Sequence, residues 1–215
     1  MAETALAVPR LIVFSDASRA PRSLMLARFD ELGRRALCGS VVFCLRDYEL
    51  SARARWALAR ELAALAALRE QVFGVADRAD LARAFKCQAF HLPERGLSPA
   101  DARRYLGANV FLSQACHDPL DSAAPELDAR LLSPLFEERK GRPPLGLAVL
   151  ERAGQASSGR PALFALGAVN ASNAAACLRA RAAGVAVIGA ALAADPAPLL
   201  EALGILRAGA SPAAR

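Results

Sequence analysis

Short apolar runs alternate with segments of helical periodicity along almost the whole chain, and this alternation limits the fold more than any other feature. A run of four to seven apolar residues bounded by polar or turn residues is typical of a buried strand. The alternation gives eight strand–helix units of about 25 residues each. The eight strands are expected at residues 11–14, 40–45, 71–75, 87–92, 109–115, 129–132, 161–166 and 184–188.

Between these strands the sequence predicts helices that can serve as crossovers. Ser51 and Ser98 stand where N-caps are expected, and Pro99 suits a first helical position. Residues 133–145 are polar and contain prolines, which indicates a loop. The helices are expected at residues 21–36, 52–68, 79–85, 99–106, a short one at 119–127, one after residue 170 and one at 196–206.

Strands that are apolar on both faces and joined by helices form parallel sheets. Eight such units predict an α/β fold, a single (β/α)8 TIM barrel covering residues 1–207, with a frayed tail at 208–215. An open doubly wound sheet is the alternative, because the runs at 71–75 and 129–132 are weak strand patterns.

The composition narrows the class of protein. The chain has 215 residues, 54% of them hydrophobic, without an apolar run of the ~18 residues that a membrane span needs. The first ten residues lack a basic region, so we expect a soluble, cytoplasmic protein without membrane contact. The net charge of +6 comes from arginines scattered along helical segments, among them Arg53, Arg55, Arg60, Arg103 and Arg104. This distribution predicts solvated helix surfaces and no nucleic-acid site, and it suits an anionic small ligand.

The five cysteines are spread singly, mostly within apolar segments. None of them has metal-ligand spacing to another, and their number is odd, so we expect buried free thiols without a disulfide framework or a zinc site.

Two of the last strands end in a glycine followed by a small residue, at Gly167-Ala168 and at Gly189-Ala190. Turns of small residues bring backbone N–H groups close to an anion, and a following helix N-terminus favours negative charge. The sequence therefore offers a phosphate cup built from these two strand ends. Short structural connections without a ligand explain the same glycines equally well.

Charged residues follow the other predicted strands. In a (β/α)8 barrel the functional groups lie on the loops after the strands, so these residues are expected to gather at one mouth. They are Asp16, Arg46, Asp47, Asp77, Arg78, Glu94, Arg95, His117, Asp118, Lys140 and Arg142.

Taken in order, these segments resemble the thiamine phosphate synthase superfamily. The resemblance rests on Leu45-Arg46-Asp47, Asp77-Arg78, His91-Leu92, His117, Lys140, Ala165-Leu-Gly167 and Gly184 to Ile188, and it spans Leu11 to Ala197. This superfamily contains the synthase and a relative, the thiazole tautomerase. The segment from His91 to Pro99 is more similar to the tautomerase branch. The resemblance implies a phosphorylated thiazole or pyrimidine ligand.

Departures from the synthase pattern limit what the resemblance implies. Asp77 matches one of the family's magnesium carboxylates, but glycine stands at the second, Gly96. Ala115 replaces a serine that contacts pyrophosphate, residues 136–140 replace a Pro-Thr-x-Thr-Lys loop, and Ala168 and Gly189 replace a glycine and a small hydroxyl residue of the phosphate site. Magnesium stays possible with Asp77 as a ligand, but no cofactor is required, and synthase activity is expected to be very slow or absent.

The tautomerase function needs only a phosphate cup and a group that moves a proton. His117 matches the family's histidine, and histidine suits acid–base work near neutral pH. Cys116 is its neighbour on the strand, so the two side chains should point to opposite faces. Asp77 is the second catalytic candidate, although Asp77 and Arg78 also suit a helix N-terminus. His91 is expected in the barrel wall.

We therefore expect thiazole-tautomerase-like proton transfer on a phosphorylated thiazole. Arg46, Arg78, Lys140, Gly167, Ala168, Gly189 and Ala190 are the expected phosphate-binding residues. A thiamine phosphate synthase, or an inactive homologue that binds a ligand or another protein, is the alternative. A homo-oligomer is possible.

Overall fold

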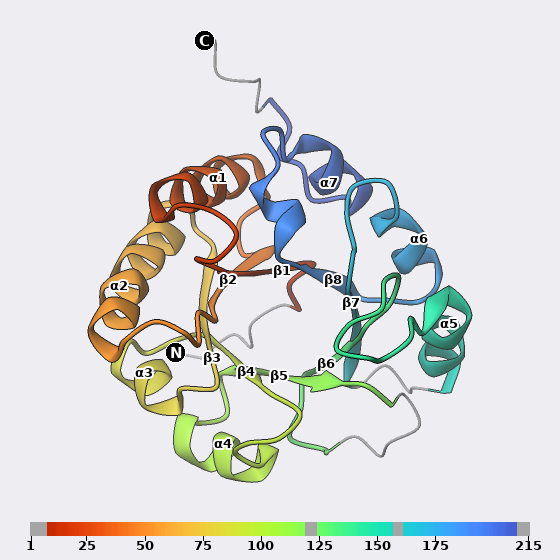
Figure 1. The fold of residues 1–215 in the computed structure, drawn as a ribbon, viewed down its shortest axis with the longest axis horizontal. Coiled ribbons are helices and arrows are strands. Elements are labelled where there is room, and N and C mark those ends of the chain that lie inside the picture. Colours follow the sequence, from red (N-terminus) through yellow and green to blue (C-terminus); the bar gives the residue numbers. More distant parts are fainter. Residues whose placement is uncertain (1–7, 119–123, 157–160, 210–215) are drawn as a thin grey trace, which may run out of the picture.

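Eight parallel strands close into one barrel that a ring of helices surrounds (Figure 1). The computed structural model describes residues 8–118, 124–156 and 161–209. Each strand pairs with the next, and β8 pairs with β1 to complete the ring. The predicted (β/α)8 barrel is thus confirmed, and the open doubly wound sheet is wrong. The strands are β1 (Leu11–Phe14), β2 (Val41–Leu45), β3 (Val72–Ala76), β4 (Ala89–Leu92), β5 (Phe111–Cys116), β6 (Ala129–Leu132), β7 (Ala162–Leu166) and β8 (Gly184–Val187).

The helices follow the strands as crossovers, and two of them begin at the serines expected from the sequence. Ser51 and Ser98 each accept a hydrogen bond from the backbone N–H three residues later. The helices are α1 (Arg22–Arg35), α2 (Ala52–Leu68), α3 (Ala79–Ala84), α4 (Pro99–Leu106), α5 (Gly146–Ala156), α6 (Ala174–Arg179), the 3₁₀ turn η1 (Gly189–Leu192) and α7 (Ala197–Ala202).

Three predictions about helices need correction. Residues 124–127 of the short helix expected at 119–127 are not helical, and its residues 119–123 lie outside the described ranges. Helix α5 was not predicted, and it directly follows the loop at 133–145. The sequence places a helix directly after Gly189, but this residue begins only a 3₁₀ turn, whereas the helix expected after residue 170 is present as α6.

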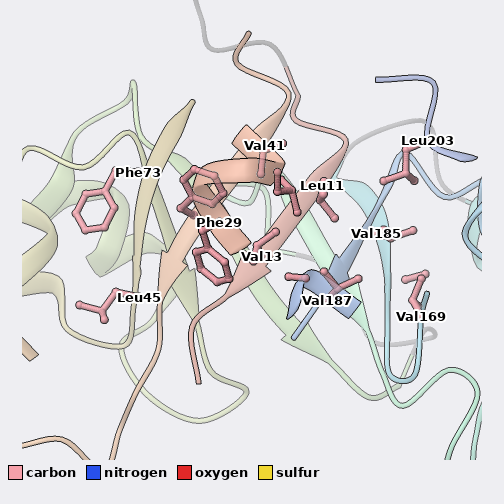
Figure 2. Packing of buried hydrophobic residues seen from close by; sticks show 14 of the residues in the cluster. Leu11, Val13, Phe29, Val41, Leu45, Phe73, Val169, Val185, Val187 and Leu203 are labelled. Atoms are coloured by element: carbon pink, nitrogen blue, oxygen red, sulfur yellow. The ribbon is translucent and has the colours of Figure 1, made fainter. Parts of the chain in front are cut away.

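Alternate residues of the strands fill the barrel interior, and the others pack against the helices. The interior cluster includes Ile12, Phe14, Val42, Phe111 and Phe164. The outer cluster lies between the strands and the helices, as the side chains in Figure 2 show. In it the rings of Phe29 from α1 and Phe43 from β2 stack with centroids 5.4 Å apart. Two apolar layers on the strands explain why their sequences are apolar on both faces.

Several residues expected at the surface or in the core lie elsewhere. Arg55 is only 5% exposed, and it donates a hydrogen bond to the carbonyl oxygen of Ala76 at 2.8 Å. Arg103 donates to backbone carbonyls and to Asp128, so it ties α4 to the start of β6. Cys38 is exposed, which corrects the expectation of buried thiols, while the other four cysteines are buried. Within the described ranges, no helix is long and apolar enough to cross a membrane.

Candidate active site at the barrel mouth

The mouth is the end of the barrel where the strands finish, and its β1–β2 side is held by two carboxylates. Asp47 is buried and accepts hydrogen bonds from the hydroxyl of Ser15 and the backbone N–H of Ala17. Asp16 accepts a hydrogen bond from Nη2 of Arg46 at 2.8 Å. Burial acts to raise the pKa of Asp16, but a hydrogen bond from Ser18 and the charge of Arg46 bring it below its ordinary value. Arg46 is therefore held at the mouth by a charge-assisted hydrogen bond.

The β7–β8 side offers unpaired backbone amides. The N–H groups of Gly167, Ala168, Gly189 and Ala190 donate no hydrogen bond to another described residue. Ala168 has a φ of 55°, as a tight turn of this kind requires. These amides come from turns, so the expected helix dipole does not add to them at Gly167. They are the donors that an anion cup needs.

Each glycine of this cup has its own surroundings. Gly167 has a φ of +110°, and a Cβ placed on it would lie 2.8 Å from the backbone nitrogen of Leu135. Close packing with the loop after β6 therefore requires glycine there, whatever the ligand. A Cβ on Gly189 would meet only Nη1 of Arg19, at 3.4 Å. Arg19, from the loop after β1, thus places a positive charge beside the cup.

His117 lies just beyond β5 and is held by a backbone carbonyl. Its Nδ1 is 2.6 Å from the carbonyl oxygen of Ser133. A carbonyl oxygen only accepts, so Nδ1 carries a proton, and Nε2 is the nitrogen free to exchange one. Nε2 lies 3.7 Å from Oε2 of Glu94, which follows β4. The Sγ of Cys116 contacts the backbone carbonyl of Asp118 and Nη2 of Arg130. These described contacts do not involve the imidazole of His117.

Glu94 also binds a guanidinium from the loop after β6. Nη2 of Arg142 donates to Oε2 of Glu94 at 3.0 Å. This hydrogen bond is the largest effect on Glu94, and it holds the pKa of that carboxyl below its ordinary value despite partial burial. His117, Glu94 and Arg142 thus form a mouth cluster that joins the loops after β5, β4 and β6.

Asp77 and Arg78 follow β3, but they do not act as a pair. Arg78 donates two hydrogen bonds to Asp80 in the first turn of α3, and this hydrogen bonding is the largest effect that lowers the pKa of Asp80 to about 2. The helix N-terminal role considered for Arg78 therefore fits its contacts. Asp77 is exposed, and its φ of 68° lies in the left-handed region.

Magnesium, which the resemblance implies, has a poor ligand set here. A Cβ placed on Gly96 would lie 3.7 Å from Oδ1 of Asp77, so a carboxylate at position 96 would share a site with Asp77. Glycine supplies no such oxygen, and Glu94 is engaged by Arg142. In the described parts of the chain, no group of three or more His, Cys, Asp or Glu side chains is arranged to hold a metal. The residues present do not fit a magnesium ion held by two carboxylates.

His91 lies in the barrel interior, as expected. It is 7% exposed, and its Nδ1 is 3.0 Å from the hydroxyl oxygen of Ser113. Its ring packs edge-on against Phe14, with centroids 4.9 Å apart. Burial, and then the charge of Arg46, lowers the pKa of His91 to about 3. His91 is therefore neutral near neutral pH.

Some residues that contact the mouth were not among the predicted site residues. Lys140 and Gly141 are the central residues of a tight turn, with φ angles of 52° and 74°, closed by two hydrogen bonds between Arg139 and Arg142. Lys140 is exposed on this turn, and Arg142 is the residue that contacts Glu94. Glu94 and Arg142 were expected at the mouth among the charged residues that follow the strands, but not among the predicted site residues. Arg19 was not expected there, although it too is a charged residue on a strand-end loop, which was the available signal.

The fold and the site together define a class: (β/α)8 barrels with charged residues at the mouth and free amides after the last two strands, where such barrels frequently bind phosphate. A family model described as thiamine monophosphate synthase matches residues 21–191. The chain therefore belongs to the thiamine monophosphate synthase family.

Named relatives agree with this assignment. The chain is 32% identical over 210 residues to a thiamine-phosphate synthase of Mycobacterium tuberculosis (strain ATCC 25177 / H37Ra), a match that covers 91% of this chain and 92% of that protein. It is 32% identical over 143 residues to a thiamine-phosphate synthase of Thermus thermophilus, a match that covers 65% of this chain and 69% of that protein. The tautomerase branch is not confirmed by these comparisons.

Solved structures agree on the fold. Thiamine phosphate pyrophosphorylase from Pyrococcus furiosus superposes with a TM-score of 0.73 at 20% identity, covering 91% of this chain and 95% of that one. N-(5'-phosphoribosyl)anthranilate isomerase from the same organism gives a TM-score of 0.59 at 15% identity, covering 91% and 97%.

Proposed function

We propose that this protein binds a phosphorylated thiazole at the mouth and moves a proton between two positions of the thiazole, as a thiazole tautomerase does. The observation that carries the proposal is the setting of His117. Its Nδ1 proton is committed to the carbonyl of Ser133, so Nε2 can take a proton from one position of the ligand and return it to another.

Glu94 supports this role of His117. A carboxylate 3.7 Å from Nε2 stabilises the imidazolium that forms when Nε2 takes up a proton. The hydrogen bond from Arg142 holds the pKa of Glu94 below its ordinary value, so Glu94 is a carboxylate near neutral pH. The ligand's phosphate would bind the amides after β7 and β8, with Arg19 beside Gly189 adding positive charge. Binding and proton transfer thus use different parts of the mouth.

Thiamine phosphate synthase activity is the second candidate, because the named relatives of this chain carry that name. That reaction joins an aminopyrimidine to thiazole phosphate and releases pyrophosphate. The chain lacks the second carboxylate at Gly96, and Ala115 has no hydroxyl to donate to a departing pyrophosphate. Without those groups the electrostatic stabilisation of the leaving group is largely lost.

A two-reaction assay separates the candidates. The purified protein is incubated with the thiazole carboxylate phosphate in D2O and followed by NMR, and in parallel with aminopyrimidine diphosphate, thiazole phosphate and magnesium. We expect deuterium incorporation in the first reaction and little or no thiamine phosphate in the second. Thiamine phosphate formed at ~1 per second or faster, within the ordinary range of enzymes, would establish the synthase instead. Activity in neither reaction would favour the inactive homologue.

A further inference from the structure

In the mouth cluster, only part of the guanidinium of Arg142 makes hydrogen bonds. Nη2 of Arg142 donates to Glu94, but Nη1 is shut off from solvent and has no hydrogen-bond partner among the described residues. A buried N–H without an acceptor is unfavourable, so such groups in native proteins usually have a partner that completes them. A ligand with an anionic oxygen would supply that partner.

Arg142 contacts Glu94, which stands two positions before Gly96, where the resemblance places the family's second magnesium carboxylate. Asp77 faces Gly96 instead of a second carboxylate, so the residues that remain do not hold magnesium between two acidic side chains. The nearby carboxylate of Glu94 is paired with Arg142 itself. The positive charge available to a ligand at this side is therefore a fixed guanidinium.

We propose that Arg142 is a specificity residue that binds an acidic group of the ligand, its carboxylate, in the absence of any metal. Arginine binds carboxylates through two parallel N–H groups, and Arg142 already holds the carboxylate of Glu94 with one. The phosphate of the same ligand goes to the amides after β7 and β8. Arg142 thereby distinguishes thiazole phosphates that carry a carboxylate from those that do not. This inference rests on the proposed function for its ligand, but not on proton transfer by His117.

The test measures the binding of two ligands by calorimetry in the presence of EDTA: thiazole phosphate with and without its carboxylate. The variant is Arg142→Gln, and Arg139→Gln is the matched control, because Arg139 is exposed at the other end of the same turn. A charge-assisted hydrogen bond corresponds to roughly 10- to 100-fold in affinity. We expect Arg142→Gln to lower the affinity for the carboxylated ligand by that factor and to change the affinity for the other ligand by no more than about twofold. The melting temperature of Arg142→Gln should equal that of Arg139→Gln.

Four results would overturn the inference. An equal loss of affinity for both ligands would mean that Arg142 binds the phosphate or only stabilises the fold. Unchanged affinity for the carboxylated ligand in Arg142→Gln, with deuterium exchange intact in the wild type, would reject the inference and leave the proposed function standing. A wild type whose affinity rises on adding magnesium would show that a metal supplies the charge. Failure of the wild type to bind either ligand would reject both proposals.

Discussion

Nε2 of His117 lies 3.7 Å from Oε2 of Glu94, across the loops that follow two neighbouring strands. The two residues are 23 positions apart in the chain, yet the pairing of β4 with β5 brings their loops together. This relationship gives the histidine a carboxylate on its exchangeable side and a carbonyl on the other.

Replacing Glu94 by Gln tests that relationship. Loss of the carboxylate removes the charge that stabilises the imidazolium, so the rate of deuterium exchange at saturating ligand should fall by up to about fivefold, the range expected of an exposed ion pair. Exchange rates of both proteins at saturating ligand check this effect. The exposed Glu138→Gln serves as control, and a rate in Glu94→Gln equal to that of the wild type would disprove the coupling.

The cup predicts a different outcome for Gly189→Leu. A Cβ there would meet only Arg19 and would not collide with backbone, so the fold should survive while the leucine covers the free amides. Titration with inorganic phosphate should show no binding by this variant, whereas Ala193→Leu, at an exposed position beyond η1, should bind like the wild type. Equal affinity in Gly189→Leu and wild type would argue against a cup. Gly167 is unsuitable for this test, because a Cβ there would collide with Leu135.

His91 predicts a dependence of stability on pH. Its pKa is about 3 in the folded protein and near 6.5 when unfolded, so the unfolded chain binds the extra proton between these values. The free energy of unfolding contributed by His91 is therefore full above pH 6.5 and falls as the pH drops toward 3. Between about pH 7 and about pH 4.5 the wild type should lose about 2 kcal/mol more than His91→Gln. Urea unfolding of both proteins at the two pH values measures this, and parallel losses would contradict the burial of a neutral histidine.

The missing carboxylate at position 96 predicts that the Gly96→Asp variant gains magnesium binding. The new carboxylate would stand beside Asp77 and give the ion two acidic ligands. Because a ligand that binds only the folded state stabilises it, magnesium at about ten times its dissociation constant should raise the melting temperature on the order of 3 °C. The wild type should not respond. A response of equal size in both proteins would mean that the wild-type residues already bind the ion.

The barrel was predictable because each strand is apolar on both faces and each crossover has helical periodicity. Gly167 and Gly189 were also recognisable, since a backbone requirement leaves a glycine in the sequence. Helix α5 was missed because its small and apolar residues follow a proline-bearing loop without a clear N-cap. The error at 124–127 has a different cause, since the short segment between β5 and β6 has only a poor helical pattern.

The side-chain partners in the mouth were not predictable. Arg142 and Glu94 lie 48 residues apart, and no local pattern indicates their contact. Lys140 and Arg142 are both basic, and only the tight turn at Lys140–Gly141 determines which one contacts Glu94. The choice of Asp80 as the partner of Arg78 likewise depends on rotamers.

Proton transfer by His117 is decided by comparing the exchange rate of His117→Gln with that of the wild type. Removal of a general acid–base group costs ~10²–10⁴-fold in rate. We expect deuterium incorporation into the thiazole carboxylate phosphate, measured by NMR in D2O, to slow by that factor. The dissociation constant of the ligand should be nearly unchanged, because the phosphate binds elsewhere in the mouth. A His117→Gln variant that exchanges as fast as the wild type would show that another group moves the proton.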